Sequence, residues 1–163
     1  MPILRERLTT RLPIAETFDF IADFANSMHW DPGVATSERL DPGPIGIGAR
    51  YRLGVRMRGR IAPMEYVITT YECPSKVVLT GDGSGVHAVD DIRFSATPGG
   101  GTQVDYVADI RLRGLLRLAE PFAGGAFAKI ANDAVVGMQR ALDARAAAAA
   151  HVGATEVSGR TEG

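Results

Sequence analysis

The stretch Arg50-Tyr-Arg-Leu-Gly-Val-Arg-Met-Arg58 decides the fold class, because arginines alternate in it with apolar residues. Successive side chains of a β-strand point to opposite faces of a sheet. The alternation therefore predicts a strand with one buried face and one face in water, which is typical of antiparallel sheets. The residues expected on the buried face are Tyr51, Leu53, Val55 and Met57.

The segments around this strand predict further strands in succession. Turn-forming residues separate them, among them Asp31-Pro-Gly33 and the run Pro98-Gly-Gly-Gly101, which is a strong hairpin signal. We also expect a loop at Gly81-Asp-Gly-Ser-Gly85. The expected strands cover residues 3–11, 34–40, 50–58, 61–71, 77–80, 86–97 and 102–112.

Apolar residues at helical spacing predict helices at both ends of this run. Pro13 suits a helix start, and the pattern after it predicts a short helix over residues 14–22 and a second short turn over 23–29. An apolar stripe predicts a long helix over residues 115–149, which Pro121 and Gly124-Gly125 should interrupt early.

Length and composition suit one domain. The chain has 163 residues and a formal net charge of −1, which argues against a nucleic-acid-binding protein. Its single cysteine, Cys73, excludes an intrachain disulfide and fits a reducing compartment, so we expect a cytoplasmic location. The sequence shows no signal-peptide pattern and no long apolar run, so we expect no integral membrane association.

The order of elements predicts an α+β fold. A twisted antiparallel sheet of six to seven strands curves around the long C-terminal helix, and two short helices follow the first strand. We expect this domain to cover residues 1–149. The tail over 150–163 is rich in small and polar residues, so we expect it to be disordered.

Five short segments, in their order and spacing, resemble the START-like (helix-grip, SRPBCC) superfamily, and within it the polyketide cyclase/dehydrase and lipid-transport family. The resemblance covers roughly residues 2–145. It implies a cavity between sheet and helix and an apolar or aromatic ligand. The segments are Phe18-Asp-Phe-Ile-Ala-Asp-Phe24 after Pro13, Asn26-Ser-Met-His-Trp-Asp-Pro-Gly33, Gly48-Ala-Arg-Tyr51, Tyr71-Glu-Cys-Pro74 and Gly100-Gly-Thr-Gln-Val104.

Residues on the inner faces of the strands and on the helical stripe are the candidates for the pocket lining. Trp30 would stack on a ligand ring or, alternatively, anchor the core. The hydroxyl groups of Tyr51 and Tyr106 would orient a ligand or reach water. The candidate ligand-binding residues are Trp30, Tyr51, Leu53, Val55, Asp90, Ile92, Phe94, Tyr106, Phe122, Phe127 and Ile130.

Asp90 is the main polar candidate, because it shares strand parity with Ile92 and Phe94 and should point inward. A buried carboxyl group needs a partner or a raised pKa. A bulge at Asp90-Asp91 would place it outside instead. Glu65 is a second inward candidate, and His29 and His87 are candidate acid/base groups. Asp31 favours capping the turn over holding its neighbour His29, and His87 favours an exposed position.

The arginine row at residues 50, 52, 56, 58 and 60 favours a solvated strand face, with Asp91, Asp105 and Asp109 as candidate cross-strand partners. The alternative is contact with an anionic surface. The glycine clusters lie between strands, so they predict no dinucleotide site, and the histidines and the cysteine lack zinc spacing. We therefore expect neither a cofactor nor a metal.

The sequence favours a small-molecule binding protein, a carrier or sensor that holds a lipid-like or aromatic ligand. The alternative is an enzyme of the polyketide cyclase, aromatase or dehydratase type that uses the same cavity. A third reading is a protein contact through the outer sheet face. The sequence leaves the oligomeric state, monomer or homodimer, open.

Overall fold

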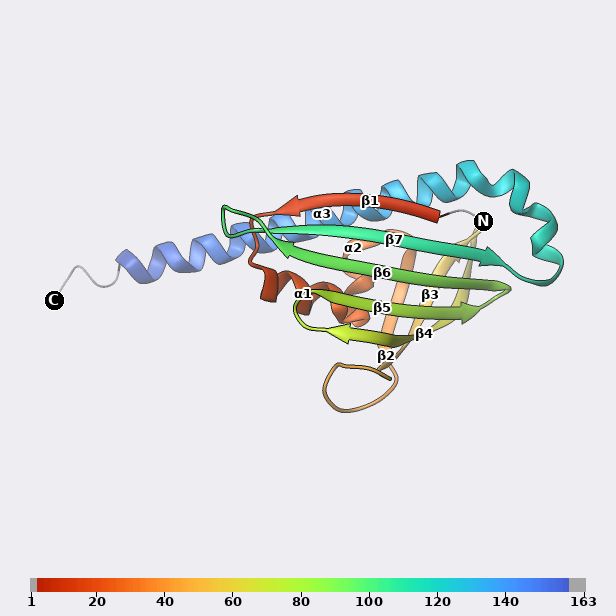
Figure 1. Ribbon diagram of the computed structural model, residues 1–163, viewed down its shortest axis with the longest axis horizontal. Coiled ribbons are helices and arrows are strands. Elements are labelled where there is room, and N and C mark those ends of the chain that lie inside the picture. Colours follow the sequence, from red (N-terminus) through yellow and green to blue (C-terminus); the bar gives the residue numbers. More distant parts are fainter. Residues whose placement is uncertain (1–2, 159–163) are drawn as a thin grey trace.

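The computed structural model describes residues 3–158. Seven strands and a long C-terminal helix make up the fold, with short helices after the first strand, so the predicted helix-grip architecture is confirmed (Figure 1). The elements are β1 (Ile3–Thr10), α1 (Ile14–Ala22), η1 (Phe24–Asn26), α2 (Ser27–Trp30), β2 (Val34–Arg39), β3 (Arg50–Met57), β4 (Arg60–Glu72), β5 (Lys76–Gly83), β6 (Val86–Ala96), β7 (Thr102–Leu112), η2 (Gly114–Ala119) and α3 (Glu120–Ser158).

All seven strands form one antiparallel sheet in the order β1-β7-β6-β5-β4-β3-β2. Hairpins connect the strands from β2 to β7, and β1 pairs with β7 and forms the edge of the sheet opposite β2. The register on β6 and β7 places Asp90 opposite Ala108 and Ile92 opposite Tyr106, so the inner residues of the two strands share one face. The parity predicted for Asp90 is therefore confirmed.

The helix α3 runs alongside β1 and packs on β1 and α2 (Figure 1). Met138 and Leu142 of α3 are fully buried, which identifies the part of the helix that closes the core. Gly137 lies where a side chain would collide with the backbone carbonyl of Trp30. The absence of a side chain at Gly137 therefore lets α3 approach α2 closely.

Three predictions along the chain were wrong. The long helix predicted from residue 115 begins as α3 at Glu120, after the separate segment η2, and Gly124-Gly125 do not interrupt it. The segment predicted as a loop at Gly81–Gly85 continues β5 to Gly83, because Asp82 and Gly83 still pair with β6. The tail was predicted to be disordered from residue 150, but α3 continues to Ser158, because its alanine-rich sequence has high intrinsic helix propensity. The remainder of that tail, residues 159–163, lies outside the described residues.

The arginine row lies on the outer face at one end of the sheet. Its partners differ from those predicted: Arg50 and Arg52 pair with Glu65 on β4, and Arg52 also pairs with Glu38 on β2. The predicted partners Asp91, Asp105 and Asp109 pair with other residues because β6 and β7 do not neighbour β3. Exposed pairs of this kind contribute little stability each.

Within the described residues, no helix has the length and apolar character needed to cross a membrane.

Candidate functional site

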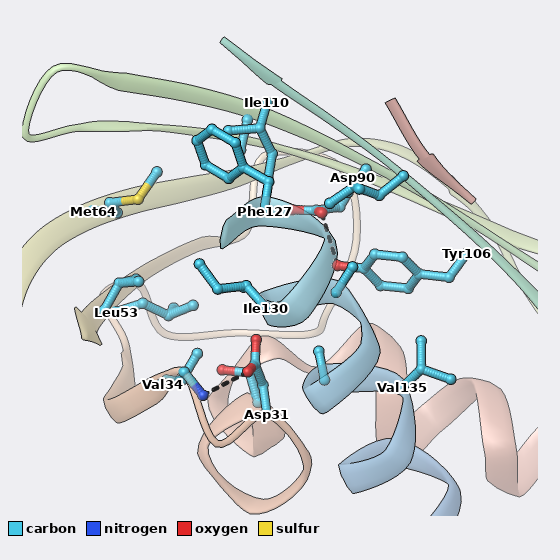
Figure 2. Close-up of a pocket in the computed structure, with 18 of the residues that line it drawn as sticks. Asp31, Val34, Leu53, Met64, Asp90, Tyr106, Ile110, Phe127, Ile130 and Val135 are labelled. Carbon is cyan, nitrogen blue, oxygen red and sulfur yellow. Dashed lines mark hydrogen bonds between the residues drawn. The ribbon is translucent and has the colours of Figure 1, made fainter. Parts of the chain in front are cut away.

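A partly open cavity of about 160 Å³ lies between the inner face of the sheet and α3. Its walls come from β1, β3, β4, β6 and β7 on one side, and from α2, the turn after it and α3 on the other. The lining is mostly aliphatic and aromatic, and the polar side chains on it are few (Figure 2). A cavity bounded in this way takes an apolar ligand and orients it through a few polar groups.

The volume of the cavity limits the size of the ligand that it can enclose. Pockets for drug-sized ligands usually enclose about 300–1,000 Å³, which is more than this cavity offers. An engineered cavity of about 150 Å³ with apolar walls binds benzene. The enclosed part therefore fits a single ring or a short branched chain, and a larger ligand would extend through the opening.

Asp90 and Tyr106 form the central polar pair of the cavity. The Tyr106 hydroxyl donates a 2.7 Å hydrogen bond to Oδ1 of Asp90 (Figure 2). Asp90 is only 5% exposed, and burial raises the pKa of its carboxyl group to about 7, although the Tyr106 hydrogen bond opposes the rise. The negative charge of Asp31 raises this pKa further. Asp90 therefore changes its charge near neutral pH.

Asp31 lies on the opposite side of the cavity, directly after α2. Its Oδ1 accepts a 2.7 Å hydrogen bond from the Gly33 amide, so the turn-forming role predicted for Asp31 is confirmed. Figure 2 shows its carboxyl group also pointing toward the space beside Ile130 and Leu53. Burial raises the pKa of Asp31, the Gly33 hydrogen bond opposes this, and the charge of Asp133 on α3 adds to the rise.

Tyr66 brings a second hydroxyl group to the lining. Its ring lies against Gly81, where an added Cβ would sit 2.5 Å from two of the ring carbons. Burial raises the pKa of Tyr66 well above its usual range, and the charges of Asp90 and Asp31 act in the same direction. Within residues 3–158, the Tyr66 hydroxyl has no hydrogen-bond partner.

Trp30 occupies the position of a core anchor. It is 3% exposed and packs edge-on against Phe24 and Tyr106, with ring centroids 6.0 and 6.4 Å apart, as a core anchor does. It also lines the cavity. Its indole Nε1 is buried without a partner among the described residues, although a buried indole N–H normally finds one.

Seven of the eleven predicted lining residues lie on the cavity wall, and four do not. Tyr51, Ile92 and Phe94 point inward as predicted but are buried beyond the cavity, in the part of the core beneath α1 and η1. Phe122 is 88% exposed, because α3 meets the sheet only farther along its length. The seven on the wall are Trp30, Leu53, Val55, Asp90, Tyr106, Phe127 and Ile130.

The remaining polar candidates lie away from the cavity. Glu65 points outward and pairs with Arg50 and Arg52, which corrects its predicted inward position. His87 pairs with Asp82 at 2.8 Å, and His29 is exposed near the end of α2. None of these three side chains lines the cavity.

Sequence reasoning missed Asp31, Tyr66 and Glu6 as lining residues. Tyr66 alternates in step with the buried residues Met64 and Ile68, so the pattern of β4 could have predicted its inward position. Glu6 lies between Leu4 and Leu8 on the inner face of β1, opposite Tyr106. Asp31 sits in a turn, where no periodicity shows which way a side chain points.

The cavity holds no obvious ligand set for a metal. Among the described residues, no group of three or more histidine, cysteine or carboxylate side chains gathers closely enough to hold a metal ion.

Comparison with solved structures finds the same fold in distant relatives. An aromatase/cyclase from Streptomyces sp. R1128 superposes with a TM-score of 0.71 at 16% identity, over 89% of this chain and 93% of that one. A START superfamily protein from Mycobacterium smegmatis gives a TM-score of 0.67 at 13% identity, over 88% and 96%. A protein from Thermus thermophilus gives 0.71 at 12% identity, over 86% and 97%. At these identities the likeness shows the fold alone.

Comparison at the sequence level gives the family. No curated protein matches the chain. The family described as polyketide cyclase/dehydrase and lipid transport matches residues 1–150, which includes every strand and most of α3. The resemblance inferred from the five short segments is thereby confirmed, and the chain belongs to the polyketide cyclase/dehydrase and lipid-transport family.

Proposed function

We propose that this protein is a small-molecule binding protein, a carrier or sensor that holds a hydrophobic ligand about the size of one ring in the cavity under α3. The observation that carries the proposal is the cavity itself, an apolar space with a few polar groups on its wall. Membership of a family described by lipid transport and by cyclase or dehydrase activity supports it.

An enzyme of the cyclase, aromatase or dehydratase type is the second candidate. The Asp90–Tyr106 pair favours it, because a buried carboxyl group with a pKa of about 7 is able to give and take protons near neutral pH. One of the similar structures is an aromatase/cyclase. Both candidates use the same cavity, so they differ in whether the bound molecule leaves changed.

Native mass spectrometry of the purified protein, followed by organic extraction, tests whether a molecule is retained. Trp30 is the only tryptophan in the chain and lines the cavity, so its fluorescence reports directly on occupancy. We expect 2-phenylethanol to change this fluorescence saturably. A ligand recovered unchanged supports the carrier or sensor, and a ligand converted by the protein supports the enzyme.

Two alanines on α3 provide a matched pair of variants. Ala134 lines the cavity, so Ala134→Phe should fill it and weaken 2-phenylethanol binding at least tenfold. Ala128 is exposed on the same helix and off the lining, so Ala128→Phe should leave binding unchanged. Equal affinities in both variants, or no saturable binding and no retained molecule, would overturn the proposed function.

A further inference from the structure

We infer that the ligand carries a protonated amine on its apolar or aromatic body, and that Asp31 and Asp90 bind this amine from opposite sides of the cavity. The inference rests on the proposed function, because it names the class of ligand for the same cavity.

The charges on the wall are strongly one-sided. Three carboxyl groups, those of Glu6, Asp31 and Asp90, line the cavity, and Arg56 is the one basic side chain on the described lining. Arg56 is exposed and follows the alternation that places Arg50 and Arg52 on the outer face of β3. Neither Asp31 nor Asp90 forms an ion pair among the described residues. A buried carboxylate without a cation is costly, and a ligand cation would relieve that cost.

Hydrogen-bonding capacity also remains unused at the wall. Asp90 uses Oδ1 for Tyr106 and Asp31 uses Oδ1 for Gly33, which leaves Oδ2 of each without a partner among the described residues. The Tyr66 hydroxyl, on a residue more than nine-tenths buried on the lining, has none either. An ammonium group has three N–H donors and no acceptor, so it complements two free carboxylate oxygens and a hydroxyl oxygen.

Aromatic rings surround these oxygens. Trp30 and Tyr106 contact each other edge-on, and Phe24 contacts both Trp30 and Tyr66, so four rings form a continuous aromatic wall. Cations are attracted to the faces of such rings, most strongly when water is excluded. The same rings provide contact area for an apolar ligand body.

Other ligand charges match this wall less well. An anionic ligand would face three carboxyl groups with only the exposed Arg56 in compensation. A metal ion requires several ligands converging at one point, and no such group occurs among the described residues. A neutral ligand would leave the free carboxylate oxygens without a charged partner. An organic cation alone satisfies both the charge and the unused acceptors.

Three probes that share one phenyl ring test the inference: 2-phenylethylamine, 2-phenylethanol and 3-phenylpropanoate. Their affinities are measured at pH 7.5 by calorimetry and by Trp30 fluorescence. We expect the amine to bind at least tenfold more tightly than the alcohol, and the acid to bind more weakly than the alcohol. A carboxylate buried in the cavity wall should favour the amine over the alcohol and the acid, because it forms charge-assisted hydrogen bonds with the amine.

Two neighbouring aspartates on β6 give a matched pair of variants. Asp90→Asn keeps the shape of the side chain and an acceptor for Tyr106, and it should bring the amine-to-alcohol affinity ratio to within about threefold of one. Asp91 lies on the opposite face of β6 and pairs with Lys76 and Arg93, so Asp91→Asn should keep the tenfold preference. Asp31→Asn serves as an independent second variant in a turn and should also lower the ratio.

The outcomes separate the inference from the proposed function. If the alcohol binds saturably but the amine binds no better, the inference is overturned and the proposed function stands. If the preference for the amine survives in both Asp90→Asn and Asp31→Asn, the assigned carboxyl groups are wrong. If none of the three probes binds and no molecule is retained on purification, both fail.

Discussion

At the scale of single residues, the neighbours Asp90 and Asp91 show how adjacent positions on one strand place the same side chain in two different environments. Asp91 faces outward and forms ion pairs with Lys76 and Arg93. Asp90 faces a largely apolar cavity, where burial holds the pKa of its carboxyl group near 7. The difference comes from strand alternation, because both residues have the same side chain.

Asp90 should make the protein less stable as the pH rises from 5 to 8. Its pKa is about 7 in the folded protein against 3.8 ordinarily, so the folded state binds the proton more tightly than the unfolded state does. The stabilisation is complete below pH 3.8 and is lost as the pH rises through 7. Between pH 5 and 8 the loss amounts to about 2–3 kcal/mol in the free energy of unfolding.

Urea unfolding of the wild type and of Asp90→Asn at pH 5 and pH 8 measures this loss. The stability of the variant relative to wild type should rise by about that amount between the two pH values, whereas Asp91→Asn should show little such change.

Other titrating groups should not disturb this comparison. Asp41, Glu65, Asp105 and Asp109 have lowered pKa values, so their contributions to stability change only in more acidic solution. The titratable and charged groups that line the cavity with Asp90 are Tyr106, Tyr66, Asp31, Glu6 and Arg56. A constant difference between the two proteins would contradict the assignment.

At the scale of elements, α3 consists of parts with different packing. Around Gly137 the helix touches the backbone of α2, and Met138 and Leu142 are buried. Near its start, Gly124 and Gly125 have open space around them and Phe122 is exposed. The cavity lies between these parts, next to Phe127, Ile130 and Ala134. The length of the helix therefore matters less to the site than where it makes contact.

Replacing two glycines of α3 should have opposite effects. Gly137→Ala forces its Cβ against the Trp30 carbonyl and should lower the free energy of unfolding by about 1–3 kcal/mol. Gly125→Ala meets nothing within 4 Å and should raise it by up to about 1 kcal/mol, because alanine favours the helix more than glycine does. Urea denaturation measures both. Equal stabilisation by the two substitutions would show that α3 does not contact α2 closely.

At the scale of the whole molecule, the elements differ in how tightly they are packed, so their local stability should differ as well. The central strands β5 and β6 are paired on both sides and contain fully buried residues such as Val77, Leu79 and Ile92. The segment η2 has no buried residue and carries the exposed side chains of Leu115 and Leu118. The fold is therefore packed less tightly at η2 than at its central strands.

Hydrogen exchange measures this gradient directly. Amides of β5 and β6 should exchange slowest, at rates that follow global unfolding, and those of η2 should exchange at least a hundredfold faster through local opening. A bound ligand should slow exchange in α3 around Phe127–Met138, because those residues line the cavity. Equal protection of η2 and β6 would contradict this difference in packing.

The family and the architecture followed from the sequence by itself. Strand alternation and the apolar stripe of α3 are local patterns, and they correctly predicted the succession of strands, the long helix and the inward position of Asp90. Most of the inward-facing candidates on the wall, such as Leu53, Val55 and Tyr106, follow from the same alternation.

Only the tertiary structure decided which inward residues meet the cavity. Tyr51 and Phe94 share the inner face with Leu53 and Asp90, but α1 and η1 cover them, whereas α3 stands away from the sheet beside Leu53 and Asp90. Asp31 lies on the cavity wall in a turn, where the sequence has no periodicity that predicts the direction of a side chain. Glu65 points outward and pairs with Arg50 and Arg52. Periodicity specifies the face of a strand, but the distance between two packed elements depends on residues far apart in the chain.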